Sequence, residues 1–169
     1  MIFNGKNGSD IPQIRQHQKY MMQAFKLAEQ AYDEDEIPVG AIIVKDNRIV
    51  GKGYNQTERL KDATAHAEML AISAACSTLQ NKYLPDCTLY VTLEPCPMCT
   101  GALVWSKIKR VVFGAPDAKA GACGSLFNLS NSDRLNHQAE IIQGIMEEDC
   151  KWILKQFFEE KRSGENGQS

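Results

Sequence analysis

The stretch Thr88-Leu89-Tyr90-Val91-Thr92-Leu93-Glu94-Pro95-Cys96-Pro97-Met98-Cys99 combines a β-strand pattern with two closely spaced cysteines. Residues 88–93 are rich in β-branched and aromatic side chains, which predicts a strand that stops before Pro95. Proline suits the first turn of a helix, so a helix is expected from here through Met98 towards Trp105. A strand that leads directly into a helix indicates an α/β protein.

The flanking segments continue this alternation of strands and helices. An amphipathic helix is expected from about Lys19 to Asp33, because Met21, Phe25, Ala28 and Tyr32 recur at helical spacing. The other expected elements are a hairpin over 39–44 and 48–53, a polar loop over 55–64, a helix over 66–79, strands over 110–114 and 140–143, and a closing helix with Cys150, Ile153, Leu154, Phe157 and Phe158 on one face. We therefore expect a three-layer α/β/α fold, a central five-stranded mixed sheet flanked by helices on both faces.

The length and composition favour one globular domain. The chain has 169 residues, of which 43% are hydrophobic and 24% charged, close to the averages for proteins with a packed core. We expect a single domain over 1–169, with an ordered core of about 17–162 and flexible ends at 1–16 and 163–169.

Charge and hydropathy limit the classes of partner. The net charge is -2 and the pI about 5.9, so an RNA-binding site would have to be a local patch; Lys107, Lys109, Arg110 and Lys119 form the basic cluster considered for it. No apolar run approaches the roughly 20 residues of a membrane span, and the first ten residues lack the apolar core of a signal peptide. We expect a cytoplasmic protein without a membrane partner, whose six cysteines serve thiol or metal chemistry rather than disulfides.

Two segments carry side chains suited to a metal site. Cys96 and Cys99 lie three residues apart at the start of the expected helix, so both sulfurs can face the same way. An imidazole from His66 completes a set of nitrogen and sulfur ligands that suits zinc. Three protein ligands leave the fourth position open for water, which is the arrangement of a catalytic zinc site.

Glu68 follows the proposed histidine ligand by two residues. A carboxylate beside zinc-bound water can take its proton and deliver it to a substrate. Residues two apart on a regular helix point nearly opposite ways, so we expect His66 in the irregular entry turn of its helix and Glu68 one step inside.

Other interpretations of the cysteines are open. A Cys-x-x-Cys after a strand also describes a thioredoxin-like redox pair. It could equally be half of a structural four-ligand zinc site, completed from Cys76, Cys87, Cys123 or Cys150; otherwise these four are interpreted only as small buried apolar residues. The joint pattern of His-Ala-Glu opening one helix and Pro-Cys-x-x-Cys opening the next, with a strand between, is typical of zinc deaminases that act on nucleobases.

From about Tyr20 to Arg162 the chain resembles the bacterial tRNA-specific adenosine deaminases of the cytidine/deoxycytidylate deaminase superfamily. The zinc motifs are common to the superfamily, whereas Phe113-Gly114-Ala115-Pro116-Asp117-Ala118-Lys119 and Phe157-Phe158 favour the tRNA branch. Further matching segments are Ile37-Pro38-Val39-Gly40-Ala41, Gly53-Tyr54-Asn55 and Thr64-Ala65-His66-Ala67-Glu68. The chain departs from the family at Ala63, where proline is usual.

The resemblance implies a cytidine-deaminase-like fold and zinc-dependent hydrolytic deamination of adenosine to inosine. It implies one Zn²⁺ per subunit on His66, Cys96 and Cys99, with Glu68 as the proton shuttle. The substrate would be a tRNA anticodon stem-loop, at the wobble position of an arginine tRNA, and the protein would be a homodimer. Asn55 would hydrogen-bond the flipped base and Asp117 a neighbouring sugar; Ala67, Lys119 and Phe158 complete the expected substrate-binding residues.

Alternative functions use the same residues differently. A small-molecule base or nucleotide deaminase, acting on guanine or cytosine, would share the zinc site without needing RNA contacts. A noncatalytic zinc-binding RNA module would have no use for Glu68. Asn55 and Asp117 also suit turns, and Phe157 suits core packing.

Overall fold

The computed structural model describes residues 11–167. The helices are α1 (Ile11–Asp33), α2 (Thr57–Leu60), α3 (Ala67–Leu79), α4 (Pro97–Trp105) and α5 (Glu147–Asn166). The strands are β1 (Gly40–Lys45), β2 (Arg48–Tyr54), β3 (Thr88–Leu93), β4 (Arg110–Ala115) and β5 (Glu140–Gln143). Residues 1–10 and 168–169, parts of the expected flexible ends, lie outside the described residues.

The five strands form one mixed sheet in the order β2-β1-β3-β4-β5. β1 is antiparallel to both β2 and β3, whereas β3, β4 and β5 are parallel to one another. As a result β2, β3 and β4 all end at the same edge of the sheet, where Leu93 lies opposite Ala115. The segments that follow these three strands therefore meet at this edge.

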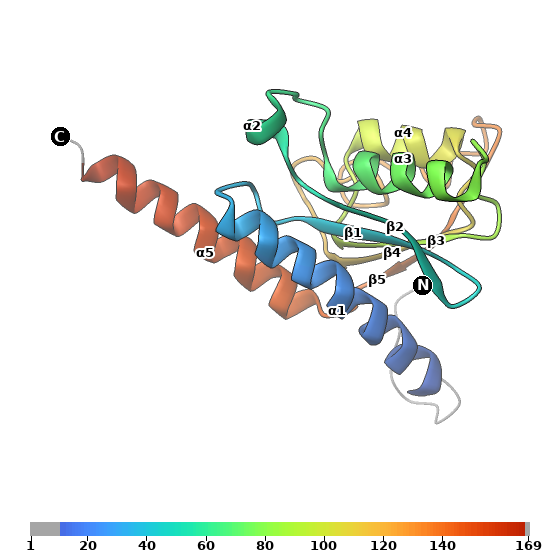
Figure 1. Ribbon diagram of the computed structural model, residues 1–169, viewed down its shortest axis with the longest axis horizontal. Coiled ribbons are helices and arrows are strands. Elements are labelled where there is room, and N and C mark those ends of the chain that lie inside the picture. The colour runs from blue at the N-terminus through green and yellow to red at the C-terminus, as the bar shows by residue number, and fades with distance from the viewer. Residues whose placement is uncertain (1–10, 168–169) are drawn as a thin grey trace.

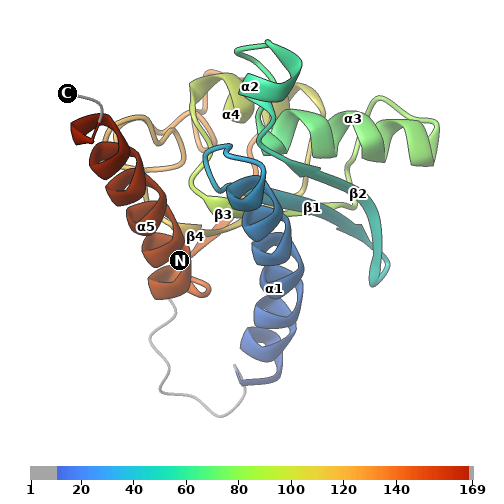
Figure 2. The same cartoon turned by 60° about the vertical axis from the view of Figure 1, so that its left-hand side comes forward.

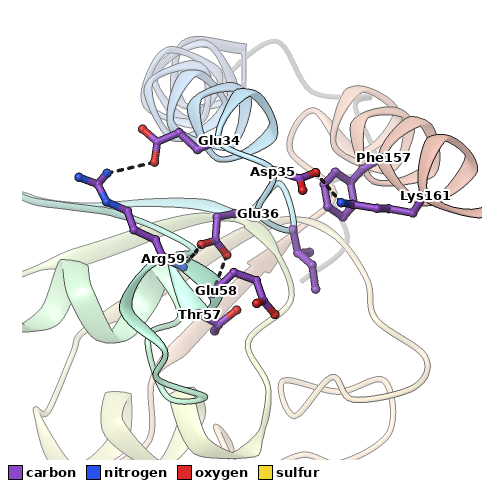
Figure 3. Close-up of a pocket in the computed structure, with 9 residues that line it drawn as sticks. Glu34, Asp35, Glu36, Thr57, Glu58, Arg59, Phe157 and Lys161 are labelled. Carbon is purple, nitrogen blue, oxygen red and sulfur yellow. Dashed lines mark hydrogen bonds and ion pairs between the residues drawn. The ribbon is translucent and has the colours of Figure 1, made fainter. Parts of the chain in front are cut away.

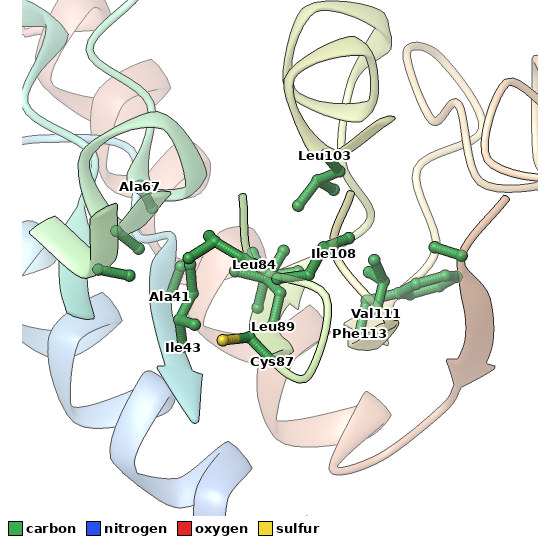
Figure 4. Close-up of a cluster of buried hydrophobic side chains, with 14 of the residues drawn as sticks. Ala41, Ile43, Ala67, Leu84, Cys87, Leu89, Leu103, Ile108, Val111 and Phe113 are labelled. Atoms are coloured by element: carbon green, nitrogen blue, oxygen red, sulfur yellow. The ribbon is translucent and has the colours of Figure 1, made fainter. Parts of the chain in front are cut away.

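Helices cover both faces of the sheet (Figures 1 and 2), with α1 and α5 on one face and α3 and α4 on the other. Alternate residues of each strand serve the two layers: in β3, Leu89 and Val91 pack in the cluster with α3 and α4, and Tyr90 packs with α1 and α5. Figure 4 shows the first of these clusters, which also contains Ala67 and Leu103. The expected three-layer α/β/α fold is confirmed.

Small residues bring α3 unusually close to β2. A Cβ atom at Gly53 would lie only 2.4 Å from the carbonyl oxygen of Ala67, and one at Gly51 only 2.4 Å from that of Ala71. The position of α3, and of the side chains at its start, therefore depends on glycine in the neighbouring strand.

Three expectations about the ends and loops are wrong. α1 begins at Ile11 rather than near Lys19, so residues 11–16 are helical; buried His17, whose Nδ1 lies 2.9 Å from the Tyr90 hydroxyl, ties this part of α1 to the sheet. α5 continues to Asn166, so residues 163–166 belong to a helix whose apolar pattern has already ended at Phe158. The expected loop over 55–64 contains the single-turn helix α2.

No helix within residues 11–167 is long and apolar enough to cross a membrane.

Candidate active site

His66, Cys96 and Cys99 come together where two helices begin. His66 is the extended residue before α3, with φ −74° and ψ 153°, and Glu68 lies inside the first turn of that helix. Cys96 is the equivalent residue before α4, and Cys99 lies in the first turn of α4. The expected placement of His66 and Glu68 is thus confirmed.

The three side chains fit a zinc ion. His66 Nδ1 lies 3.6 Å from Cys96 Sγ and 3.5 Å from Cys99 Sγ. Tetrahedral zinc with ordinary Zn–N and Zn–S bond lengths requires about 3.6 Å between such a nitrogen and sulfur. Within residues 11–167 no other group of three histidine, cysteine or acidic side chains is placed to hold a metal ion. Because the four other cysteines do not join this group, the structure does not support a four-ligand structural site.

Without a metal ion, the pKa values of His66, Cys96 and Cys99 are shifted in ways that favour the binding of a cation. Hydrogen bonds from Cys99 and from His66 lower the pKa of Cys96 to about 4, against the burial of the thiolate. The hydrogen bond to Cys96 raises the pKa of His66, and the same kind of bond together with burial raises the pKa of Cys99. The negative charge of the Cys96 thiolate therefore favours the protonated forms of His66 and Cys99. A metal ion that binds to the three side chains replaces those protons.

Glu68 is a buried carboxyl group beside the metal ligands, with only 4% of its surface exposed. Burial raises the pKa of Glu68 from 4.5 to about 7. A group with a pKa near neutrality can both accept and return a proton, as a general acid–base catalyst must.

A cavity of about 160 Å³ opens in front of this group. It is lined by Asn55, Ala67 and Asp117 of the expected substrate-binding residues, together with His66, Glu68 and Cys96. Ile37, Val39 and Leu93 supply an apolar wall. The cavity thus pairs proton-transfer and metal-ligating groups with surfaces suited to a flat, partly apolar base.

The two expected base- and sugar-binding residues also shape their own loops. Asn55 Oδ1 accepts a hydrogen bond from the Thr57 amide at 3.4 Å, and Asp117 Oδ1 accepts bonds from the amides of Lys119 and Ala120 at 3.0 and 3.2 Å. The turn-forming interpretation of both residues is therefore compatible with their places in the cavity wall.

Lys119 and Phe158 do not line the cavity. Lys119 is exposed two residues beyond Asp117, and Phe158 is 43% exposed on α5. Phe157, in contrast, is buried and packs edge-on against Tyr32 with ring centroids 5.8 Å apart, in agreement with its interpretation as a core residue.

The basic cluster expected as a local patch is not one surface. Lys107, Lys109 and Arg110 lie at or just before the start of β4, whereas Lys119 follows the end of β4. Arg110 is also paired with Glu140 at 2.8 Å. The prediction of one basic cluster is wrong because a strand about 17 Å long separates its members.

Two buried carboxylates near the cavity were given no role by sequence reasoning. Glu36 is 1% exposed, and its oxygens accept hydrogen bonds from the amides of Glu58 and Arg59, at 3.1 and 2.6 Å, at the start of α2. Glu94, 2% exposed, lines the cavity itself. The available signal for Glu94 was an acidic residue at the end of an apolar segment, directly before Pro95-Cys96. Glu36 is the last residue of an acidic run, directly before Ile37-Pro38, and nothing local distinguishes it from its neighbours.

A larger hollow of about 540 Å³ adjoins the cavity at Ile37, which lines both (Figure 3). Two ion pairs border it: Arg59 with Glu34 at 3.1 Å and Lys161 with Asp35 at 2.5 Å. These pairs connect the turn after α1 to α2 and to α5. The hollow has cationic groups and an aromatic ring but no metal-ligating trio within the described residues.

Fold and site together define a zinc-dependent deaminase. Residues 14–115 match the family model of the cytidine and deoxycytidylate deaminase zinc-binding region. The chain is 47% identical to the tRNA-specific adenosine deaminase of Bacillus subtilis over 149 residues. This aligned region covers 88% of this chain and 92% of the relative. The chain therefore belongs to the cytidine and deoxycytidylate deaminase family, in its tRNA-specific adenosine deaminase branch.

Solved structures agree with the assignment to the family, and the first of them also with the tRNA branch. A structure from a study of A-to-I editing by tRNA:A34 deaminases is 38% identical, with a TM-score of 0.77, over 80% of this chain and 98% of that one. A guanine deaminase from Bacillus subtilis is 40% identical, with a TM-score of 0.58, over 64% of this chain and 70% of that one.

Proposed function

We propose that this chain catalyses the hydrolytic deamination of adenosine to inosine in tRNA, at the wobble position of an arginine tRNA anticodon. We further propose that it acts in the cytoplasm as a homodimer. The observation that carries the reaction is the buried Glu68 carboxyl beside an open three-ligand metal set at the base of a cavity of about 160 Å³. The choice of tRNA rests on the relatives.

His66, Cys96 and Cys99 would hold the zinc ion. When bound there, zinc supplies a coordinated water that is acidic enough to act as a nucleophile at neutral pH. Glu68 accepts the proton that this water gives up and donates it to ring nitrogen N1 while oxygen bonds to C6. The same carboxyl then takes the remaining proton from the oxygen on C6 and passes it to the exocyclic nitrogen, and the C6–N bond breaks to release ammonia. Water and adenosine are thereby converted to inosine and ammonia.

The other residues hold the substrate. A base in an anticodon loop can be turned out of its stack at low cost and enter the cavity. The side-chain amide of Asn55 and the wall formed by Ala67 contact the base, whereas Asp117 contacts the sugar of a neighbouring nucleotide. Lys119 and Phe158, exposed outside the cavity, would contact the RNA beyond the target nucleotide.

The testing experiment supplies zinc-loaded protein with an arginine tRNA anticodon stem-loop that has adenosine at the wobble position. The same stem-loop with cytidine there, free guanine, free cytosine and free adenosine run in parallel, with Glu68→Gln as the inactive control. We expect inosine in the RNA alone, and only with Glu68 present. Ammonia from a free base with the RNA unchanged would refute the tRNA substrate but retain the zinc chemistry. Sedimentation velocity tests the homodimer separately.

A further inference from the structure

Glu94 joins two parts of the active site. It follows β3 directly and precedes Cys96 by two residues. Its amide donates a hydrogen bond of 2.9 Å to the carbonyl of Ala115, where β4 ends. Its side chain is buried and forms part of the cavity wall. A carboxylate in such a place must be fully hydrogen-bonded, because its desolvation is otherwise costly.

The carboxylate of Glu94 collects donors from one segment, residues 117–125. Oε1 accepts from the Asp117 amide at 3.2 Å and from the Ser125 hydroxyl. Oε2 accepts from the amides of Cys123 and Ser125, each at 3.1 Å. A Cβ at Gly121 would lie 2.2 Å from Oε2, so the segment can wrap this closely only because Gly121 has no side chain.

We infer that Glu94 is a positioning residue, whose buried carboxylate fixes the 117–125 segment as a wall of the substrate cavity. This segment contains no helix or strand, and its Asp117 and Ala120 line the cavity. Only scattered backbone hydrogen bonds hold the segment, such as those from the Gly121 amide to the Asp117 carbonyl and from the Ala122 amide to the Pro95 carbonyl, each 2.8 Å long. The four hydrogen bonds to Glu94 add to these. Because Glu94 is covalently close to Cys96, the wall is set relative to the metal ligands.

The hydrogen bonds that Glu94 accepts also distinguish its positioning role from a role in proton transfer. Each carboxylate oxygen of Glu94 accepts two donors from the protein, which leaves little capacity to receive a proton from a substrate. Glu68, the buried carboxyl beside the metal ligands, is the group left for that step. Loss of Glu94 should therefore weaken substrate binding while the chemical step in the bound complex is largely kept.

The test uses the full zinc-loaded chain with Glu94→Gln, Ser125→Ala and their double variant, beside Glu148→Gln as a control whose side chain is 90% exposed on α5. In Glu94→Gln an NH₂ group replaces one acceptor and faces backbone donors. We expect zinc to be retained and the amides of Asp117, Cys123 and Ser125 to exchange with deuterium at least about tenfold faster. KM for the anticodon stem-loop should rise about tenfold or more, with kcat within about threefold of wild type.

Ser125→Ala removes one donor without altering the carboxylate, so it should raise the exchange rates and KM by less than Glu94→Gln does. Its effect should be smaller in the Glu94→Gln background than in wild type. It also provides the test if Glu94→Gln does not fold. Unchanged exchange in 117–125, or a fall in kcat at constant KM, would overturn the inference. The kinetic readout rests on the proposed function, whereas exchange does not. An inactive wild type therefore refutes the proposed function and leaves exchange to decide on Glu94.

Discussion

Replacement of Gly53 by alanine should disable the active site from a distance. The added Cβ would lie 2.4 Å from the Ala67 carbonyl oxygen and 2.7 Å from the Ala71 amide nitrogen, where ordinary contacts begin at 3.4 Å. Both neighbours are backbone atoms of α3, so the helix as a whole must move by about 1 Å. That helix carries Glu68, and His66 directly precedes it. A displacement of this size costs on the order of 100-fold in rate, and overpacking costs about 1–3 kcal/mol of stability.

Gly101→Ala is the matched control. Gly101 lies in α4, which carries Cys99, but its Cβ would meet nothing within 4 Å, and alanine is the better helix former. Deamination kinetics on the stem-loop, zinc content and thermal unfolding should be measured for both variants. We expect Gly53→Ala to lose activity and melt earlier, and Gly101→Ala to keep its activity and melt no earlier. Wild-type kcat in a stably folded Gly53→Ala protein would refute the claim that this contact sets the position of Glu68.

Three further outcomes are expected. Removal of zinc by a chelator should lower the melting temperature, and added zinc should restore it, because the ion binds only the folded protein, in which the three ligands are assembled. Calorimetry measures the melting temperature, and the same value with and without zinc would contradict this prediction. In zinc-free protein the raised pKa of Glu68, about 7, makes a contribution to stability that is complete below pH 4.5 and lost as pH rises through 7. Zinc-free Glu68→Gln should therefore have a higher free energy of unfolding than zinc-free wild type at pH 8, and the difference should shrink towards pH 5. Urea unfolding measures both values, and a difference that does not change with pH would argue against this account. Phe158→Ala should raise KM for RNA without altering the melt, whereas Phe157→Ala should cost about 3–5 kcal/mol of stability; equal melts for the two would contradict the assignment of Phe157 to the core.

Local sequence patterns predicted the sheet and the metal ligands. Thr88–Leu93 and Glu140–Gln143 are strands with the expected bounds, and β4 differs by one residue at Ala115. His66, Cys96 and Cys99 were predictable because the chemistry of zinc restricts both residue type and spacing. The irregular placement of His66 followed from the direction of side chains on a helix.

The parts that were missed depend on residues far apart in the sequence. Residues 11–16 have only Ile11 and Ile14 as apolar side chains besides proline, too few to mark a helix, and their place in α1 follows from the helix that continues them into buried His17. α2 has no side-chain cap of its own, and receives its cap from Glu36. The role of Glu94 is apparent only once Ser125, 31 residues later, folds back onto it. No local pattern encodes such pairings.

The remote cap on α2 has a consequence for the order of folding. A helix of one turn is too short to persist alone, since nucleation outweighs its few hydrogen bonds. α2 can therefore form only after the turn that carries Glu36 has docked beside it. The strands and α3, whose apolar contacts are extensive, have no such requirement. We expect the loop that begins at Asn55 to be among the last parts of the chain to become native. A folding intermediate would then possess a sheet and metal ligands before it possesses a complete cavity for the base.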